Sequence, residues 1–135
     1  MLKEYIASIR DKKVSVIGIG VSNTPLIRLL AQNGVHVTAH DKKLREQMTE
    51  LAEEFEGLGV RLVLGPDYLS GIDGDIVFRT PGMHPGNPAL ESLRRKGAEV
   101  TSEMEVFFEV CPCQILAVTG SDGKTTTTAL ISEML

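Results

Sequence analysis

Short apolar runs alternate with amphipathic segments of helical length along most of the chain, and this alternation limits the possible folds more than any other feature. Strands are predicted at residues 13–18, 35–40, 60–65, 75–80, 98–100 and 114–120. Helices are predicted at residues 2–10, 24–34, 44–56, 88–97, 102–110 and 125–135. Strands joined by helices are typical of βα units, which build a mostly parallel sheet. The sequence therefore predicts an α/β fold.

The composition is that of a globular protein and argues against several classes of partner. Of the 135 residues 42% are hydrophobic and 24% are charged, and the net charge of −4 comes without a basic stripe. Nucleic acid and acidic membranes are therefore not expected as partners. No apolar run of about 18 residues could span a bilayer, and the charged N-terminus is unlike a signal peptide. We expect a cytoplasmic protein with a small-molecule ligand, whose only cysteines, Cys111 and Cys113, are reduced thiols.

The first of two glycine-rich loops is GIGVSN, at residues 18–23, between a predicted strand and a predicted helix. Gly18 permits a tight turn, Gly20 lets the backbone approach a pyrophosphate, and the helix N-terminus offers free N–H groups. Asn23 stands where the G-x-G-x-x-G pattern has its third glycine, so the close helix–strand packing of a standard NAD site is not expected. The loop predicts a Rossmann-like sheet that binds a nucleotide.

Asp41 follows the second predicted strand, near the spacing of about 20 residues at which an acidic residue binds the ribose of a nucleotide. Lys42 and Lys43 come directly after it. With the glycine loop upstream, we favour ligand binding by these three residues. The alternative is that Asp41 caps the next helix and that both lysines are simply solvated.

The second loop, TGSDGKTTTT at residues 119–128, is a variant of the P-loop pattern G-x-x-x-x-G-K-[ST]. Val118 occupies the first glycine position, and the first glycine comes at Gly120 instead. Lys124 can still reach the β- and γ-phosphates of ATP, and the Thr125 hydroxyl can ligate Mg²⁺. The alternative is a turn rich in serine and threonine that caps a helix. The only acid after Lys124 is Glu133, on the same predicted helix, so the chain alone is not expected to complete an ATP site.

Four further side chains were weighed as candidates. Arg79 ends the fourth predicted strand and is placed to meet an anion. His36, His40 and His84 are separated and lack a nearby acidic pattern, so we expect no metal or catalytic role for them.

Taken in order, GIGVSN, AHDKK, FRTPGMHPGNP, TSEMEVFF and AVTGSDGKTTTT resemble the N-terminal part of the Mur ligases of peptidoglycan synthesis. The resemblance covers the whole chain but only part of such an enzyme. It implies a UDP-sugar-binding domain at residues 1–112 and the start of the central ATP-binding domain at residues 113–135, comprising a strand, the P-loop and a helix. Pro112 breaks the preceding helix at this boundary.

The resemblance also implies roles for individual residues. The UDP-sugar would be bound by Gly20, Val21, Ser22, Asp41, Lys42, Lys43, Thr80, Pro81 and Gly82. ATP would be bound by Gly120, Ser121, Asp122, Gly123, Lys124, Thr125 and Thr126. Among these, Lys124 is the implied catalytic residue and Thr125 the implied Mg²⁺ ligand. Family members often carry Ser at the position of Thr80 and Asn at that of Asp122.

For the complete enzyme the resemblance implies ATP-dependent amide formation between UDP-N-acetylmuramoyl-L-alanine and D-glutamate, by way of an acyl phosphate. We expect the chain alone to bind the UDP-sugar, to bind ATP weakly or not at all, and to show no turnover. An uncovered strand and the apolar residues Leu130, Ile131 and Leu135 lead us to expect a monomer or a weak dimer.

Two rival hypotheses remain open at this point. One is a small NAD-binding module, against which the missing third glycine and the second phosphate loop both count. The other is a non-enzymatic module that senses a nucleotide and signals to a partner. The identity of the ligand separates these hypotheses: a UDP-sugar, NAD, or neither.

Overall fold

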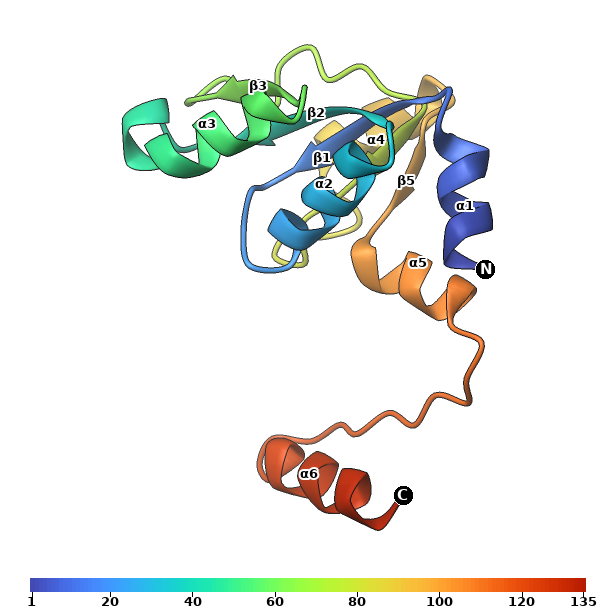
Figure 1. Ribbon diagram of the computed structural model, residues 1–135. Coiled ribbons are helices and arrows are strands. Elements are labelled where there is room, and N and C mark those ends of the chain that lie inside the picture. Colours follow the sequence, from blue (N-terminus) through green and yellow to red (C-terminus); the bar gives the residue numbers. More distant parts are fainter.

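The computed structural model describes residues 1–135 and contains a five-stranded parallel sheet with the order β3-β2-β1-β4-β5 (Figure 1). The strands are β1 (Lys13–Ile17), β2 (His36–Asp41), β3 (Arg61–Leu64), β4 (Ile76–Phe78) and β5 (Glu99–Thr101). The helices are α1 (Leu2–Ile9), α2 (Asn23–Gln32), the 3-10 helix η1 (Arg45–Gln47), α3 (Thr49–Gly57), α4 (Pro88–Arg95), α5 (Glu103–Val110) and α6 (Lys124–Met134). The predicted α/β, Rossmann-like class is confirmed.

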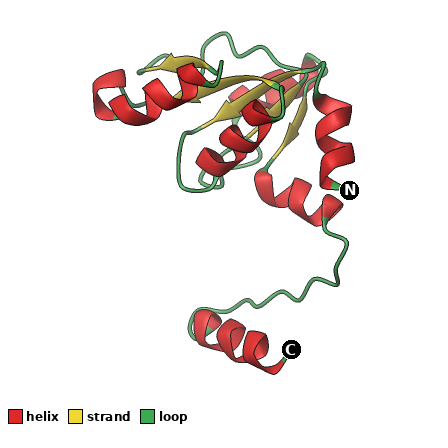
Figure 2. Cartoon of the chain, viewed as in Figure 1, coloured by secondary structure: helices red, strands yellow, loops and turns green.

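Helices cover both faces of the sheet but not equally (Figure 2). The larger core cluster joins one sheet face to α1, α2, α3 and α5, with Ile9, Ile27 and Phe55 almost fully buried. The smaller cluster joins the opposite face to α4 through Leu90 and Leu93. Because α4 lies over β1, β4 and β5 only, the second face of β2 and β3 carries no helix.

The central strand β1 pairs with β2 on one side and with β4 on the other, always in parallel. The strand order reverses at this point, which is where open α/β sheets bind ligands, just beyond the carboxyl ends of the strands. The GIGVSN loop leaves β1 at this edge, Asp41 ends β2 there, and Thr80 lies just after β4. The topology thus brings together three segments that are far apart in the sequence.

The single helix predicted at residues 44–56 is wrong in its first part. A 3-10 turn, Arg45–Gln47, comes first, and α3 begins only at Thr49, because the backbone at Met48 (φ −148°, ψ 39°) is not helical. At this break Met48 is buried in the core and 9% exposed, whereas Leu44 is 52% exposed.

The strand predicted at residues 114–120 is also not formed. This segment is extended, but it has no hydrogen-bonded neighbour and joins no sheet. A strand is completed only by pairing with another strand, and residues 114–120 pair with none of the five strands. Helix α6 follows the segment, buries none of its residues, and stands apart from the sheet (Figure 1). The domain boundary after residue 112 remains a prediction.

None of the helices is both long and apolar enough to cross a membrane. The two cysteines are free thiols; Cys111 is half-buried and Cys113 is exposed.

Candidate functional site

A pocket of about 310 Å³ lies at the carboxyl ends of the central strands. Five of the residues predicted to bind a UDP-sugar line it: Gly20, Asp41, Lys42, Lys43 and Thr80. The same pocket is lined by Ile17, Gly18, Ile19 and Tyr68, which were not predicted as site residues. The predicted residues Val21, Ser22, Pro81 and Gly82 do not line it. The structure therefore gathers the predicted set at one place, with four members outside the pocket.

Asp41 joins the end of β2 to the glycine loop. Its carboxylate is 7% exposed, and Oδ2 accepts a hydrogen bond from the Ile19 N–H at 2.7 Å. Oδ1 accepts from the Lys43 N–H at 2.8 Å. Each carboxylate oxygen can still accept a further bond. Asp41 therefore fixes the conformation of both loops that border the pocket, a positioning role that the sequence did not predict, and it does not cap α3.

The glycine loop presents free donors where an anion would lie. The backbone N–H groups of Gly20, Val21 and Ser22 donate no hydrogen bond within the chain. They precede α2, whose N-terminus adds a favourable field for negative charge. Val21 is 96% exposed, so its side chain packs against no other part of the chain.

Asn23 stands at the position of the missing third glycine, at the start of α2. The side chain is 1% exposed, and Nδ2 donates to the carbonyl oxygens of Ile17 at 3.1 Å and Gly18 at 2.9 Å. These bonds tie the first residue of α2 to the end of β1. A side-chain amide thus links the helix to the strand at the position of the third glycine, and the expected absence of the close packing of a standard NAD site stays a prediction.

Gly18 allows the loop to pass close to the residue after β4. Its φ of +87° is in the left-handed region, and a Cβ placed on Gly18 would lie 3.0 Å from the Thr80 Cβ. The pocket wall on this side is therefore built by direct contact between the glycine loop and Thr80. Lys42 and Lys43 are exposed, and neither side chain forms an ion pair, so both ammonium groups are free to meet a ligand.

Two other candidate residues, Arg79 and His84, have side chains with partners within the chain. Arg79 is 15% exposed at its side chain and pairs with Glu105 at 3.5 Å, while Nη1 donates to the Met83 carbonyl at 3.4 Å. Arg79 thus has a carboxylate partner on α5, and its contact with an anionic ligand stays a prediction. His84 Nδ1 accepts from the Gly86 N–H at 3.0 Å and so stabilises a local turn.

The second loop has the local geometry of a phosphate loop. Gly123 adopts a φ of 73° directly before α6, which a residue with a side chain rarely does. The backbone N–H groups from Gly120 to Thr126 donate no hydrogen bond within the chain. The Lys124 ammonium donates to the Gly120 carbonyl oxygen across the loop. Residues 120–126 are all exposed, and none of them lines the pocket at the glycine loop.

No family model matches this chain. The chain is 54% identical over 135 residues, 99% of its length, to a UDP-N-acetylmuramoylalanine–D-glutamate ligase from Ruminiclostridium cellulolyticum. The chain matches the N-terminal part of a Mur ligase. It spans 29% of the length of that relative.

Solved structures of two ligases share the fold. A UDP-N-acetylmuramate–alanine ligase from Thermotoga maritima superimposes with a TM-score of 0.58 and 26% identity, over 90% of this chain and 28% of that chain. A murein peptide ligase from Psychrobacter arcticus gives a TM-score of 0.59 and 23% identity, over 90% of this chain and 25% of that chain. The Mur ligase match thus extends from the sequence to the Rossmann-like architecture.

Proposed function

We propose that the chain is the UDP-sugar-binding part of an ATP-dependent, ADP-forming ligase that joins D-glutamate to UDP-N-acetylmuramoyl-L-alanine in the cytoplasm. The observation that carries the proposal is the identity of 54% to a ligase of that name, together with free phosphate-binding donors at both glycine-rich loops. The chain alone is proposed to bind the nucleotide-sugar and to lack turnover.

The pocket at the glycine loop supports binding of a nucleotide diphosphate. The amides of Gly20, Val21 and Ser22 would meet the diphosphate, because unpaired N–H groups at a helix N-terminus favour anions. Lys42 and Lys43 would add positive charge beside it. The Asp41 carboxylate holds the loop and retains acceptor capacity for a ribose hydroxyl or a uracil N–H. Thr80, Pro81 and Gly82 would border the same ligand after β4.

The second loop fits ATP and Mg²⁺ in the chemistry of its donors. Gly120 to Thr126 offer unpaired amides, and the exposed Thr125 hydroxyl is an oxygen ligand of the kind that Mg²⁺ accepts. Lys124 would exchange its bond to the Gly120 carbonyl for phosphate oxygens. ATP would supply the phosphoryl group that activates the carboxylate of the sugar substrate, and Lys124 would stabilise the negative charge on it.

The test is a calorimetric titration of the chain with UDP-N-acetylmuramoyl-L-alanine, with Mg-ATP and NAD titrated in parallel. We expect saturable binding of the UDP-sugar, weak or no binding of ATP, and no binding of NAD. Lys43→Gln is the informative variant, because Lys43 lines the pocket and its side chain forms no ion pair or hydrogen bond within the chain. Loss of a charge-assisted bond predicts an increase in Kd of about tenfold.

Lys3→Gln provides the matched control, since Lys3 is an exposed residue of α1 away from the pocket. Binding of NAD in place of the UDP-sugar would favour a dinucleotide module and contradict the proposal. Amide-bond formation catalysed by the 135-residue chain would contradict the claim that it lacks turnover.

A further inference from the structure

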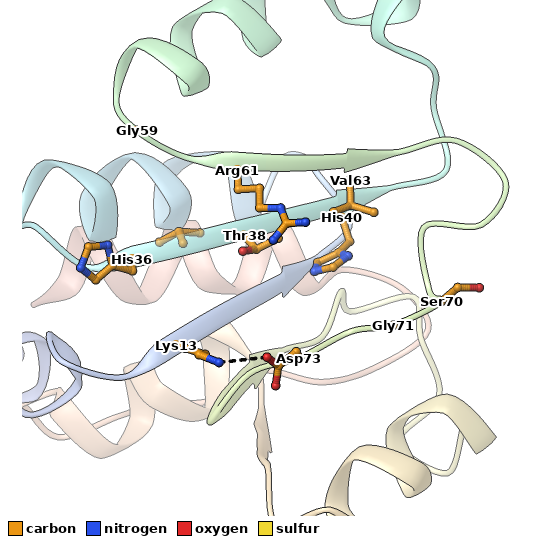
Figure 3. Close-up of a pocket in the computed structure, with 11 residues that line it drawn as sticks. Lys13, His36, Thr38, His40, Gly59, Arg61, Val63, Ser70, Gly71 and Asp73 are labelled. Atoms are coloured by element: carbon orange, nitrogen blue, oxygen red, sulfur yellow. Dashed lines mark hydrogen bonds and ion pairs between the residues drawn. The ribbon is translucent and has the colours of Figure 1, made fainter.

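A polar groove of about 410 Å³ lies on the sheet face that α4 leaves bare (Figure 3). The connection from β3 to β4 crosses this face as a loop without a helix, and it forms one wall with Ser70, Gly71 and Asp73. Only two of the 11 lining residues, Val37 and Val63, are hydrophobic. The volume falls within the range of about 300–1,000 Å³ found for small-molecule sites.

The floor of the groove is a grid of side chains from adjacent strands. Thr38 of β2 pairs in register with Arg61 of β3, and His40 pairs with Val63. Residues at alternate positions of a strand share a face, and Figure 3 shows Thr38, His40 and Arg61 on the same side of the sheet. The opposite residues of β2, Val37 and Ala39, face the larger core.

His40 contributes a buried acceptor that has no partner. The residue is 3% exposed, and its Nδ1 lies 3.0 Å from the Tyr68 carbonyl oxygen. Because a carbonyl only accepts, Nδ1 carries the proton of the neutral ring and Nε2 is left with a lone pair. Nε2 is buried and has no hydrogen-bond partner. A buried polar atom without a partner costs about 1–3 kcal/mol, so a donor at Nε2 would be stabilising.

Arg61 contributes an unpaired cation to the same floor. Its guanidinium forms no ion pair and no side-chain hydrogen bond. The other two charges of the groove, Lys13 and Asp73, neutralise each other at 3.0 Å. Among the Lys, Arg, Asp and Glu side chains of the groove, Arg61 is therefore the one charge without a partner. A guanidinium binds oxyanions through parallel N–H donors.

We propose that this groove is a second ligand site and that it binds a phosphate monoester that retains one P–OH group. The groove is separate from the nucleotide pocket. The charged oxygens lie against Arg61 and the Thr38 hydroxyl, and the P–OH donates to His40 Nε2. The volume exceeds that of phosphate alone, so the organic part of the ligand occupies the space toward Ser70 and Gly71. The proposal stands whether or not the proposed function is correct, because the groove and the nucleotide pocket share no lining residue.

The experiment follows the imidazole NMR signals of His40 in the 135-residue chain at about pH 6, near the second pKa of a phosphate monoester, where about half of the ester carries one P–OH group. Glycerol 3-phosphate, inorganic phosphate and sulfate are titrated separately. We expect saturable changes with both phosphates and tighter binding of the ester. Sulfate, which carries no O–H at this pH, binds at least about tenfold more weakly, the value of one lost hydrogen bond to a charged group. Tighter binding of inorganic phosphate than of the ester would assign the site to the free ion and overturn the ester proposal.

Arg61→Gln removes the cation and is expected to weaken binding of glycerol 3-phosphate by about tenfold. Arg95→Gln, an exposed arginine of α4 with no ion pair, is the matched control and leaves binding unchanged. Thr38→Val is a second groove variant if Arg61→Gln proves unstable. Equal binding by Arg61→Gln and Arg95→Gln would place the phosphate at a glycine-rich loop and overturn the proposal, as would the absence of any change at His40.

Discussion

At the residue scale, the side-chain amide of Asn23 links the start of α2 to the end of β1. Asn23→Ala leaves the carbonyls of Ile17 and Gly18 without their donor in a buried place. We expect the free energy of unfolding to fall by about 1–3 kcal/mol and UDP-sugar binding to weaken, because the loop is no longer tied to β1. Denaturant unfolding with parallel calorimetry measures both effects.

Asn33→Ala is a suitable comparison for that variant. Asn33 also donates from Nδ2 to a carbonyl, that of Leu29 at 2.8 Å, but it is exposed at the far end of α2. Water can replace its bond, so we expect a smaller loss of stability and unchanged binding. Equal stability of Asn23→Ala and Asn33→Ala would show that the buried amide bonds contribute nothing to the loop.

His40 makes the stability of the chain depend on pH. Burial lowers its pKa, the Tyr68 carbonyl opposes that shift in part, and the charge of Arg61 adds to it. Since the folded-state pKa lies below the unfolded value of about 6.5, the unfolded chain takes up the proton first. The stabilising contribution is therefore complete above that value and is lost as the pH falls through the folded-state pKa.

Chemical unfolding in phosphate-free buffers between about pH 7 and 5 measures this loss. We expect His40→Gln to flatten the decline, whereas His36→Gln, which replaces an exposed histidine, retains it. A His40 pKa above 6.5 in an NMR titration would contradict the argument.

Part of the pocket at the glycine loop was predictable from single residues, because loop residues at the ends of parallel strands must meet. Gly20, Asp41 and both lysines, named from the loop pattern and its spacing, and Thr80, named from the family resemblance, all line this pocket, and their contact with a ligand stays a prediction. The two backbone bonds of the Asp41 carboxylate were not predictable, since they depend on how closely two loops approach. Tyr68 was missed because the loop that carries it has no motif. The pairing of Arg79 with Glu105 depends on the position of α5, which the sequence does not reveal.

At the scale of elements, the periodicity of apolar residues and the positions of glycine and proline predicted most helices and strands to within a few residues. Two predictions failed. The helix predicted at residues 44–56 is interrupted at Met48, whose backbone is not helical although its side chain is buried. Residues 114–120 have the composition of a strand but no strand beside them. A strand forms only by hydrogen bonding to a neighbouring strand, and the sequence of a segment does not show whether such a neighbour is present.

The junction of β1 with α2 can be tested through its glycine. Gly18→Ala combines a strained φ of +87° with a Cβ at 3.0 Å from the Thr80 Cβ, whereas Gly34→Ala has a similar φ of +79° and open space. Left-handed backbone costs an ordinary residue about 1–2 kcal/mol, so we expect this loss for Gly34→Ala and a larger one for Gly18→Ala. Thermal unfolding of both variants gives the difference.

Adding Thr80→Gly to Gly18→Ala removes the colliding Cβ. The steric part of the loss should then be recovered, so the two changes are expected to be non-additive in a double-mutant cycle. Additive losses would show that the glycine loop does not rest on Thr80.

At the scale of the whole molecule, the uncovered apolar surface lies at the C-terminal end. Met104, Phe107 and Phe108 of α5 are each about half exposed at 48–51%, and their spacing places them on one helical face. In α6, Leu130 and Met134 are 60% and 84% exposed at i and i+4. Such grouped apolar residues are typical of surfaces that another segment covers.

We therefore expect the 135-residue chain to self-associate through α5 and α6, because no other segment within it covers these faces. Sedimentation should show a concentration-dependent shift from monomer toward dimer. Phe108→Lys and Leu130→Lys together should restore the monomer, whereas Leu44→Lys, which replaces a residue that is 52% exposed on the other side of the sheet domain, should not. A version that continues into the segment found in the longer ligases should be monomeric without these changes. A single monomeric species of the unmodified chain at every concentration would mean that these faces have no affinity for one another.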